Sequence, residues 1–120
     1  MRIKRLRECG EFVSGDGCRL RELLNANTEN SAFRYSLAYA VVSAGQKTAP
    51  HRIRTSEVYY ILEGQGLMHI EAETAEVKAG DAVDIPPRSL QYIENTGLDD
   101  LIFLCIVDPA WRKEDEEICG

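Results

Sequence analysis

The stretch PHRIRTSEVYYILEGQG, residues 50–66, decides the fold that we expect. Its centre, EVYYILE (57–63), is rich in β-branched and aromatic residues, and a Gly-x-Gly turn ends the run. Because alternate residues of a strand point to opposite faces of a sheet, Glu57 and Tyr59 share one face and Val58 lies on the other. The stretch therefore predicts a strand that runs into a tight turn.

Outward from this stretch, the whole chain has the turn pattern of an all-β protein. Turn-forming glycine, proline and asparagine recur at short intervals, and strand-forming runs lie between them. Many short strands at this spacing predict a sandwich, jelly roll or barrel. Residues 19–27 fit either a turn of helix or an edge strand, and residues 108–118 favour a short C-terminal helix that begins with Asp108-Pro109. The predicted strands cover residues 33–43, 57–64, 67–73, 82–86, 90–95 and 101–107.

Length and charge exclude several classes of protein. A chain of 120 residues is enough for one domain with a proper core. A net charge of −6 argues against nucleic acid as a partner. No run approaches the ~18 apolar residues that span a membrane, and no apolar segment follows the basic N-terminus as in a signal peptide. We therefore expect a cytoplasmic protein whose four cysteines, Cys9, Cys18, Cys105 and Cys119, are reduced thiols.

Two of the predicted strands are apolar on both faces. EVYYILEG (57–64) and LIFLCIV (101–107) lack the apolar–polar alternation of a sheet with one wet face. Such strands need a second cover, and a short chain has little material to supply it. This pattern predicts a homodimer formed by packing of sheet on sheet. The alternative is that the first 30 residues fold back over the sheet within one chain.

Two motifs in this turn-rich chain resemble those of the cupin superfamily. Residues 45–64 follow the first cupin motif, G-x5-H-x-H-x3,4-E-x6-G, at every position but one, where isoleucine replaces the second histidine. Residues 80–95 follow the second, G-x5-P-x-G-x2-H-x3-N, with arginine in place of the glycine and glutamine in place of the histidine. The resemblance implies a double-stranded β-helix, or jelly-roll barrel, around a central pocket. It divides the chain into an N-terminal strand or arm that covers the barrel (1–32), the barrel core (33–107) and a C-terminal tail (108–120).

The resemblance also implies a metal site, which this chain carries only in part. His51 and Glu57 take two of the four ligand positions of the family. Ile53 takes the third and cannot bind a metal, while Gln91 takes the fourth and offers a weak amide oxygen. Divalent transition metals are usually held by at least three imidazole, thiolate or carboxylate groups. A divalent metal such as Mn, Fe, Ni, Cu or Zn is therefore expected at doubtful occupancy.

Three interpretations of this pocket remain open from the sequence. In the first, His51, Glu57 and Gln91 hold a metal weakly, and the protein acts on a small polar metabolite such as a sugar, keto acid or sugar acid. In the second, no metal binds, and His51 with Glu57 forms an acid–base pair that catalyses an isomerisation. In the third, the barrel binds a ligand without chemistry, as a sensory domain does.

Four further residues bear on the pocket. Tyr59 and Ile53 are expected to line it, and Arg88 is expected at its rim, where a guanidinium can bind a carboxylate or phosphate. The chain has two histidines, and the second, His69, follows the Gly-x-Gly turn. Its face of the sheet depends on the register after the turn, so both an inward and an outward position remain open.

Overall fold

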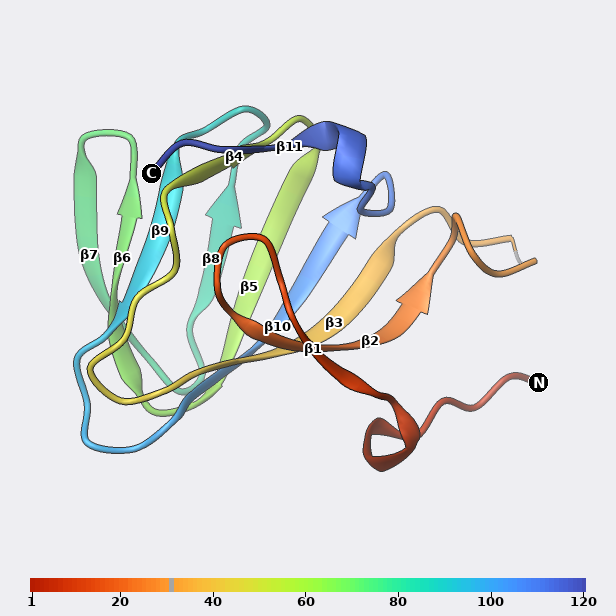
Figure 1. The fold of residues 1–120 in the computed structure, drawn as a ribbon, viewed down its shortest axis with the longest axis horizontal. Helices are drawn as coiled ribbons and strands as arrows, with labels where there is room; N and C mark the ends of the chain where they lie inside the picture. Colours follow the sequence, from red (N-terminus) through yellow and green to blue (C-terminus); the bar gives the residue numbers. More distant parts are fainter. Residues whose placement is uncertain (31) are drawn as a thin grey trace.

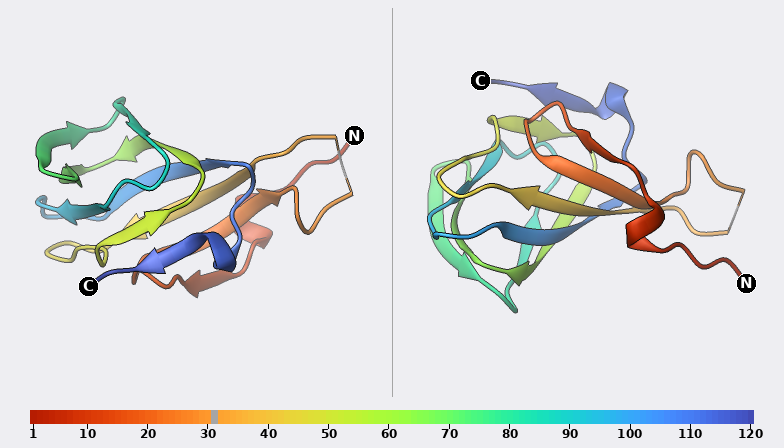
Figure 2. Two further views of the ribbon diagram at one scale, coloured as in Figure 1. Left: turned by 90° about the horizontal axis from the view of Figure 1, so that it is seen from above. Right: turned by 60° about the horizontal axis from the view of Figure 1, so that its bottom comes forward.

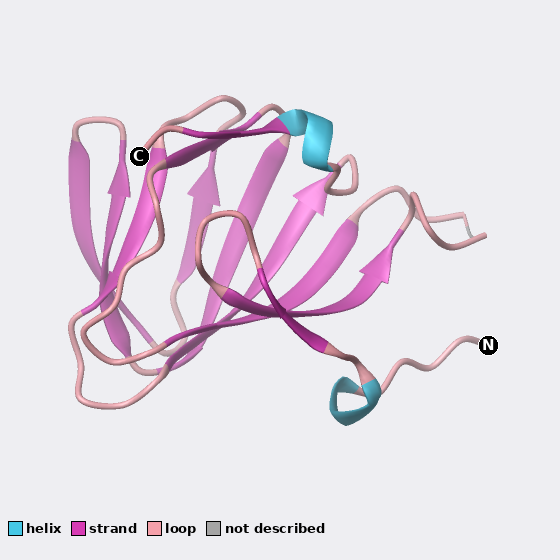
Figure 3. Cartoon of the chain, in the orientation of Figure 1, coloured by secondary structure: helices cyan, strands magenta, loops and turns pink. Residues whose placement is uncertain are grey.

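The computed structural model describes residues 1–30 and 32–120, and almost every element in that part of the chain is a strand. The two helical segments described are single 3₁₀ turns, Leu6–Glu8 and Lys113–Asp115 (Figure 3). The strands are β1 (Glu11–Val13), β2 (Arg19–Asn25), β3 (Ser36–Val42), β4 (His51–Ile53), β5 (Ser56–Glu63), β6 (Gln65–Ile70), β7 (Glu73–Lys78), β8 (Ala82–Ile85), β9 (Gln91–Asn95), β10 (Leu101–Asp108) and β11 (Glu116–Ile118). The prediction of an all-β jelly-roll barrel is confirmed.

The strands form two sheets that face each other (Figures 1 and 2). One sheet has six strands in the order β1-β2-β3-β10-β5-β8, and the other has five in the order β11-β4-β9-β6-β7. All pairings within the sheets are antiparallel. The apolar core lies between the sheets and includes Ile61, Ile93, Leu101 and Phe103.

The N-terminal segment is part of the six-stranded sheet. Residues 19–27, for which helix and strand were both open, form the strand β2, which pairs with β3. The strand β1 pairs with β2 at the sheet edge. These strands extend the sheet sideways, and Tyr60, Leu62 and Ile106 on its outer face stay exposed.

The predicted helix over residues 108–118 is wrong. Asp108 is the last residue of β10, and the tail beyond it contains the single 3₁₀ turn Lys113–Asp115 before β11, which pairs with β4 (Figure 1). The carbonyl groups of Ala110 and Trp111 accept hydrogen bonds from the side-chain amides of Asn25 and Asn27. Partners distant in the sequence therefore satisfy backbone groups that a helix would have paired locally. The helix-start sequence Asp108-Pro109 was therefore not sufficient to form a helix in this segment.

Close packing at the turn after β5 requires glycine at positions 64 and 66. Gly64 has a φ of +87°, and a Cβ atom there would lie 2.7 Å from the carbonyl oxygen of Asp100. A Cβ atom on Gly66 would lie 2.5 Å from the carbonyl oxygen of Glu94. Contacts this short leave no room for a side chain, so glycine is required for β6 to pack against its neighbours. The turn sets the register that places β5 and β9 around the same interior.

Candidate functional site

A cavity of about 220 Å³ lies inside the barrel. The residues that line it come from strands of both sheets, from the loop between β1 and β2 and from the C-terminal tail. A cavity of about 150 Å³ accepts benzene in another protein, so this one has room for a molecule of single-ring size. Its wall includes the aromatic side chains Phe12, Tyr59, Phe103 and Trp111, and the ionisable groups Asp16, Glu22, His51, Glu57 and Glu116.

His51 is the first residue of β4 and is fully buried at the cavity wall. Its Nδ1 lies 2.8 Å from the carbonyl oxygen of Ala49. A carbonyl oxygen can only accept, so Nδ1 carries the proton of that hydrogen bond. The other ring nitrogen, Nε2, faces the Oδ2 atom of Asp16 at 3.6 Å. The backbone contact thus fixes the ring, and Nε2 is the nitrogen available for chemistry.

Glu57, Gln91 and Tyr59 form a buried chain of hydrogen bonds. The Nε2 group of Gln91 donates to Oε1 of Glu57 at 3.0 Å, and the hydroxyl of Tyr59 donates to Oε1 of Gln91 at 3.1 Å. Both ends of the Gln91 amide are therefore engaged by protein groups. No hydrogen bond from the described part of the chain reaches Oε2 of Glu57, although the residue is 5% exposed. This buried carboxyl group can still bond to a ligand.

Burial changes the ionisation of Glu57 and Tyr59. Loss of water around the Glu57 carboxyl raises its pKa to about 8, against a smaller lowering by the Gln91 hydrogen bond. Desolvation likewise raises the pKa of Tyr59, with a further contribution from the nearby Glu57. At neutral pH, Glu57 is therefore mostly a neutral acid that can donate a hydrogen bond into the cavity.

The residues at the four ligand positions do not fit the divalent metal that the sequence motifs imply. Ile53 is buried in the wall and presents only hydrocarbon at the second histidine position. The amide oxygen of Gln91 already accepts from Tyr59, and one oxygen of Glu57 is held by Gln91. Within residues 1–30 and 32–120, no three histidine, cysteine, aspartate or glutamate side chains are grouped to hold a metal ion. Of the expected set, Nε2 of His51 and Oε2 of Glu57 are the donor atoms left free, and two such groups are fewer than the three that usually hold a divalent metal.

Three acidic residues of the wall, Asp16, Glu116 and Glu22, were missed by the sequence reasoning. Asp16 lies in the Gly15-Asp16-Gly17 turn between β1 and β2, and a turn sequence alone does not indicate a role in a site. Its Oδ1 atom accepts hydrogen bonds from the hydroxyl of Ser14 and, at 3.1 Å, from the backbone N–H of Cys18. Its carbonyl oxygen accepts from the backbone N–H of Ala49 at 2.7 Å, which ties the loop to the segment before β4. This hydrogen bond holds the loop in a position where the Asp16 carboxylate lies next to the His51 ring.

Glu116, the second missed residue, begins β11 and pairs with Ile53 of β4. Its Oε2 atom accepts a hydrogen bond from the indole Nε1 of Trp111 at 3.4 Å. Burial raises the pKa of its carboxyl group. The acidic run near the C-terminus gave no sign of this role, because the pairing of β11 with β4 is a long-range feature.

Two other candidates lie outside the cavity. Arg88 is exposed on a surface recess that it shares with Arg54 and Arg112, and it does not line the barrel interior. It has a φ of +66°, so it keeps the left-handed backbone for which the motif uses glycine. His69 alternates with the core residue Met68 and stacks on Tyr92, with ring centroids 4.0 Å apart. It therefore lies on the outer face of its sheet and cannot complete a metal site.

The cysteines in the described part of the chain are all free thiols. Cys18 and Cys105 line the cavity, and burial raises the pKa of both thiols well above the ordinary value. A thiol in that state is a poor nucleophile and metal ligand. Both residues serve the cavity as small apolar wall groups.

The comparisons with known proteins agree with this architecture. Residues 38–107 match the cupin domain family, Cupin_2, which accounts for more than half of the chain. This chain is a cupin. An uncharacterised protein of Methanocaldococcus jannaschii, MJ1618, is 45% identical to it over 108 residues, which is 89% of this cupin and 86% of that protein.

Two other similar proteins carry names that refer to oxalate. An oxalate-binding protein of Thermotoga maritima is 41% identical over 51 residues, which is 42% of each chain. The structure of oxalate decarboxylase from Bacillus subtilis superimposes with a TM-score of 0.80 at 23% identity, covering 95% of this cupin but 30% of that enzyme. The second likeness shows the fold alone, and this cupin spans less than a third of that enzyme.

No helix in the described residues is long and apolar enough to cross a membrane. The expected cytoplasmic location stays a prediction.

Proposed function

We propose that this cupin binds a small organic molecule of single-ring size in its barrel cavity without a resident transition metal. The observation that carries the proposal is the state of Gln91. At the position of a metal-binding histidine, its amide is held by Glu57 on one side and by Tyr59 on the other. With Ile53 at a second ligand position, the polar wall is organised around its own hydrogen bonds, and an apolar space of ligand size adjoins it.

The residues that line the cavity limit the class of molecule that it can bind. Keto acids and sugar acids carry a carboxylate, which proteins usually hold with arginine, lysine or a metal. No lysine or arginine is among the residues that line the cavity in the described part of the chain. The proposal therefore does not extend oxalate binding from the Thermotoga protein to this one.

The proposal is tested with cyclohexanol as a ring-sized neutral probe. We expect it to bind to the untagged protein, by calorimetry, with the same affinity in buffer with and without EDTA. Filling the space with Ala38→Leu, which adds bulk at the cavity wall, should abolish binding, whereas Ala82→Leu on the exposed edge strand β8 should not. Absence of binding to the wild type, or loss of binding in EDTA, would contradict the proposal.

A metal-free acid–base activity is the second candidate function. The observation that favours it is that His51, oriented by Ala49 and facing Asp16, shares the cavity with the neutral acid Glu57. No hydrogen bond or ion pair joins His51 to Glu57 in the described residues, so they would act as two groups from separate places on the wall. His51 would remove a proton from a carbon next to a carbonyl, while Glu57 donates a hydrogen bond to the carbonyl oxygen.

This candidate is tested with cyclohexanone in D₂O. We expect NMR to show faster loss of its α-protons with the wild type than with buffer alone, and no acceleration with His51→Ala. If the α-protons are lost at equal rates with the wild type and with His51→Ala, the acid–base activity is wrong and only the binding function remains.

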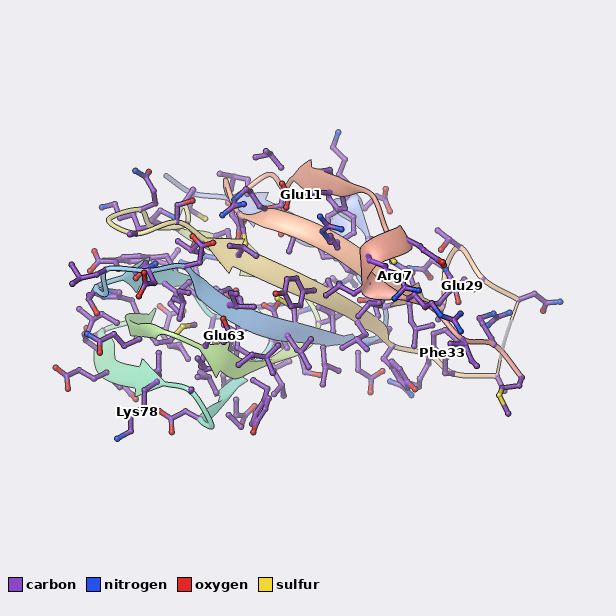
Figure 4. All side chains as sticks on the ribbon, turned by 90° about the horizontal axis from the view of Figure 1, so that it is seen from below. Arg7, Glu11, Glu29, Phe33, Glu63 and Lys78 are labelled. Atoms are coloured by element: carbon purple, nitrogen blue, oxygen red, sulfur yellow. The ribbon has the colours of Figure 1, made fainter. Side chains whose placement is uncertain are left out.

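We also propose that the protein is a homodimer that buries the outer face of the six-stranded sheet. The support is an apolar face on β5 and β10 that the chain leaves open, with Tyr60 41%, Leu62 37% and Ile106 38% exposed. Sedimentation should give a dimer for the wild type and a monomer for Tyr60→Glu. Lys78→Gln, on β7 of the other sheet (Figure 4), is the control that should stay dimeric. A monomeric wild type would contradict the proposal.

A further inference from the structure

The cavity wall carries four carboxyl groups from four separate segments. Asp16 comes from the loop after β1, Glu22 from β2, Glu57 from β5 and Glu116 from β11. His51 is the one basic group among the lining residues of the described chain. A single imidazole thus stands against four acids around one small space.

None of these four carboxyl groups forms an ion pair with a lysine or arginine in the described residues. The partner of Asp16 is His51, and the side-chain partners of Glu57, Glu22 and Glu116 are the neutral groups of Gln91, Asn25 and Trp111. Three acidic residues outside the cavity do form ion pairs with arginine or lysine. Asp108 pairs with Arg34 at 2.6 Å, Asp115 with Arg112 at 2.9 Å and Glu29 with Lys4 at 3.1 Å.

The chain has 14 lysine and arginine residues, so cations are available and stay outside the cavity. Glu57 is mostly neutral at pH 7, so the negative charge comes from the other carboxyl groups of the wall, which make the interior electrically negative in a space of low dielectric. Burial is the main cause of the raised pKa of the Cys18 thiol and of the Glu116 carboxyl group, and the Asp16 carboxylate raises both pKa values further, while His51 lowers that of Glu116. A carboxylate ligand placed there would meet the same repulsion.

Four aromatic side chains line the cavity beside its aliphatic and small residues. Tyr59 and Phe103 pack with ring centroids 4.4 Å apart, and Phe12 and Trp111 line the same cavity. The faces of aromatic rings attract a cation that lies within about 6 Å of the centroid. Acids and ring faces in one cavity are complementary to a positive charge on an apolar body.

We propose that the cavity is selective for a small organic cation, a protonated or quaternary amine attached to a ring-sized apolar group. This inference rests on the proposed binding function of the same cavity and adds the charge of its ligand. The carboxyl groups hold the charge, and the aromatic and aliphatic wall holds the body. A neutral molecule of the same shape binds more weakly, and a carboxylate is excluded.

Three probes with the same ring and different charge test the inference: cyclohexylammonium, cyclohexanol and cyclohexanecarboxylate, titrated by calorimetry at pH 7. We expect cyclohexylammonium to bind at least tenfold more tightly than cyclohexanol. The carboxylate should show no binding at concentrations where cyclohexanol saturates. Equal affinities for the ammonium and the alcohol, or tightest binding of the carboxylate, would overturn the inference.

The Asp16→Asn variant shows whether the cavity acids cause the preference. Asparagine keeps the Oδ1 acceptor that bonds to Ser14 and Cys18, so the loop should keep its conformation. We expect the variant to lose at least fivefold in affinity for cyclohexylammonium and less than twofold for cyclohexanol. Glu63→Gln removes an exposed acid of β5, outside the cavity (Figure 4), and should change neither affinity. An equal loss in both variants would assign the preference to the net charge of the protein and overturn the role of the cavity.

The two proposals fail in different ways. If none of the three probes binds, the proposed binding function is wrong. If cyclohexanol binds and the ammonium has no advantage, the binding function stands and only the charge selectivity is lost.

Discussion

The two ends of the barrel are built from the same strands and have opposite interiors. At the packed end, defined by Ile61, Met68, Ile93 and Leu101, every one of these side chains is buried in the hydrophobic core. At the hollow end, defined by His51, Ile53, Glu57 and Gln91, the interior holds a cavity and a polar hydrogen-bond chain. β5 supplies Ile61 to the first and Glu57 to the second, and β9 supplies Ile93 and Gln91 in the same way.

This difference separates what stabilises the barrel from what can bind a ligand. At the packed end, the turn into β6 approaches the backbone of Asp100 at Gly64 and that of Glu94 at Gly66. The hollow end is closed by the β1–β2 loop and the C-terminal tail, neither of which belongs to the matched segment 38–107. We therefore expect mutations at the packed end to change stability, and mutations at the hollow end to change binding and pH dependence.

The largest expected effect is a loss of stability at the packed end. Ile61→Ala should lower the free energy of unfolding by about 2–5 kcal/mol, since it leaves a void among well-packed neighbours. Ile53→Ala should cost less than half as much, because the Ile53 side chain already borders a cavity. Urea unfolding of both variants measures the difference. Equal losses would show that the two ends are packed alike.

Glu57→Gln should raise stability and change its dependence on pH. The folded-state pKa of about 8 exceeds the unfolded value of 4.5, so between these values the folded state binds one proton more. The contribution of Glu57 to stability is therefore present below about pH 4.5 and is lost as the pH rises to about 8, with a slope of about 1.4 kcal/mol per pH unit.

In the Glu57→Gln variant this contribution should no longer change with pH. We expect the variant to be more stable than the wild type at pH 8 by more than ~1 kcal/mol, since glutamine can still accept from Gln91 without a buried charge. Urea unfolding at pH 5, 6.5 and 8 provides the measurement. Parallel pH profiles for the two proteins would mean that Glu57 ionises normally.

A smaller effect is expected from removal of one hydroxyl group. Tyr59→Phe removes the donor to Oε1 of Gln91, and an unpaired buried acceptor costs about 1–3 kcal/mol. Tyr60→Phe is the matched control on the same strand, because Tyr60 is 41% exposed, and it should change stability by less than about 0.5 kcal/mol. If the two variants unfold at the same urea concentration, the hydrogen-bond chain does not stabilise the hollow end.

Much of the barrel could be predicted from local sequence patterns. Alternation along residues 57–63 correctly placed Glu57 and Tyr59 on one face, which the structure buries together with Ile61, and the turn residues bounded most of the strands. The strands β1, β4, β7 and β11 were not predicted, because they are short or exposed and carry no apolar period. They form only because a neighbouring strand offers backbone partners.

The sequence predicted the motif residues of the candidate site but not the acidic residues that complete it. His51, Ile53, Glu57, Tyr59 and Gln91 do meet at the hollow end, since the motif spacing places them on β4, β5 and β9, which face the same interior from the two sheets. Asp16 and Glu116 reach it through pairings between residues far apart in the sequence, which no local pattern encodes. The engagement of the Gln91 amide by its neighbours was likewise a matter of geometry, and it changed the expectation about a metal.

The metal content of the protein tests most directly whether the hollow end has become a cavity in place of a metal site. Untagged wild type and the double variant Ile53→His/Gln91→His, which restores the four ligand types of the motif, would be purified from medium supplemented with Mn, Fe, Ni, Cu and Zn. We expect elemental analysis to give well below one metal per chain for the wild type and close to one for the double variant. A wild type with one metal per chain that is lost in His51→Ala would contradict the interpretation of this pocket.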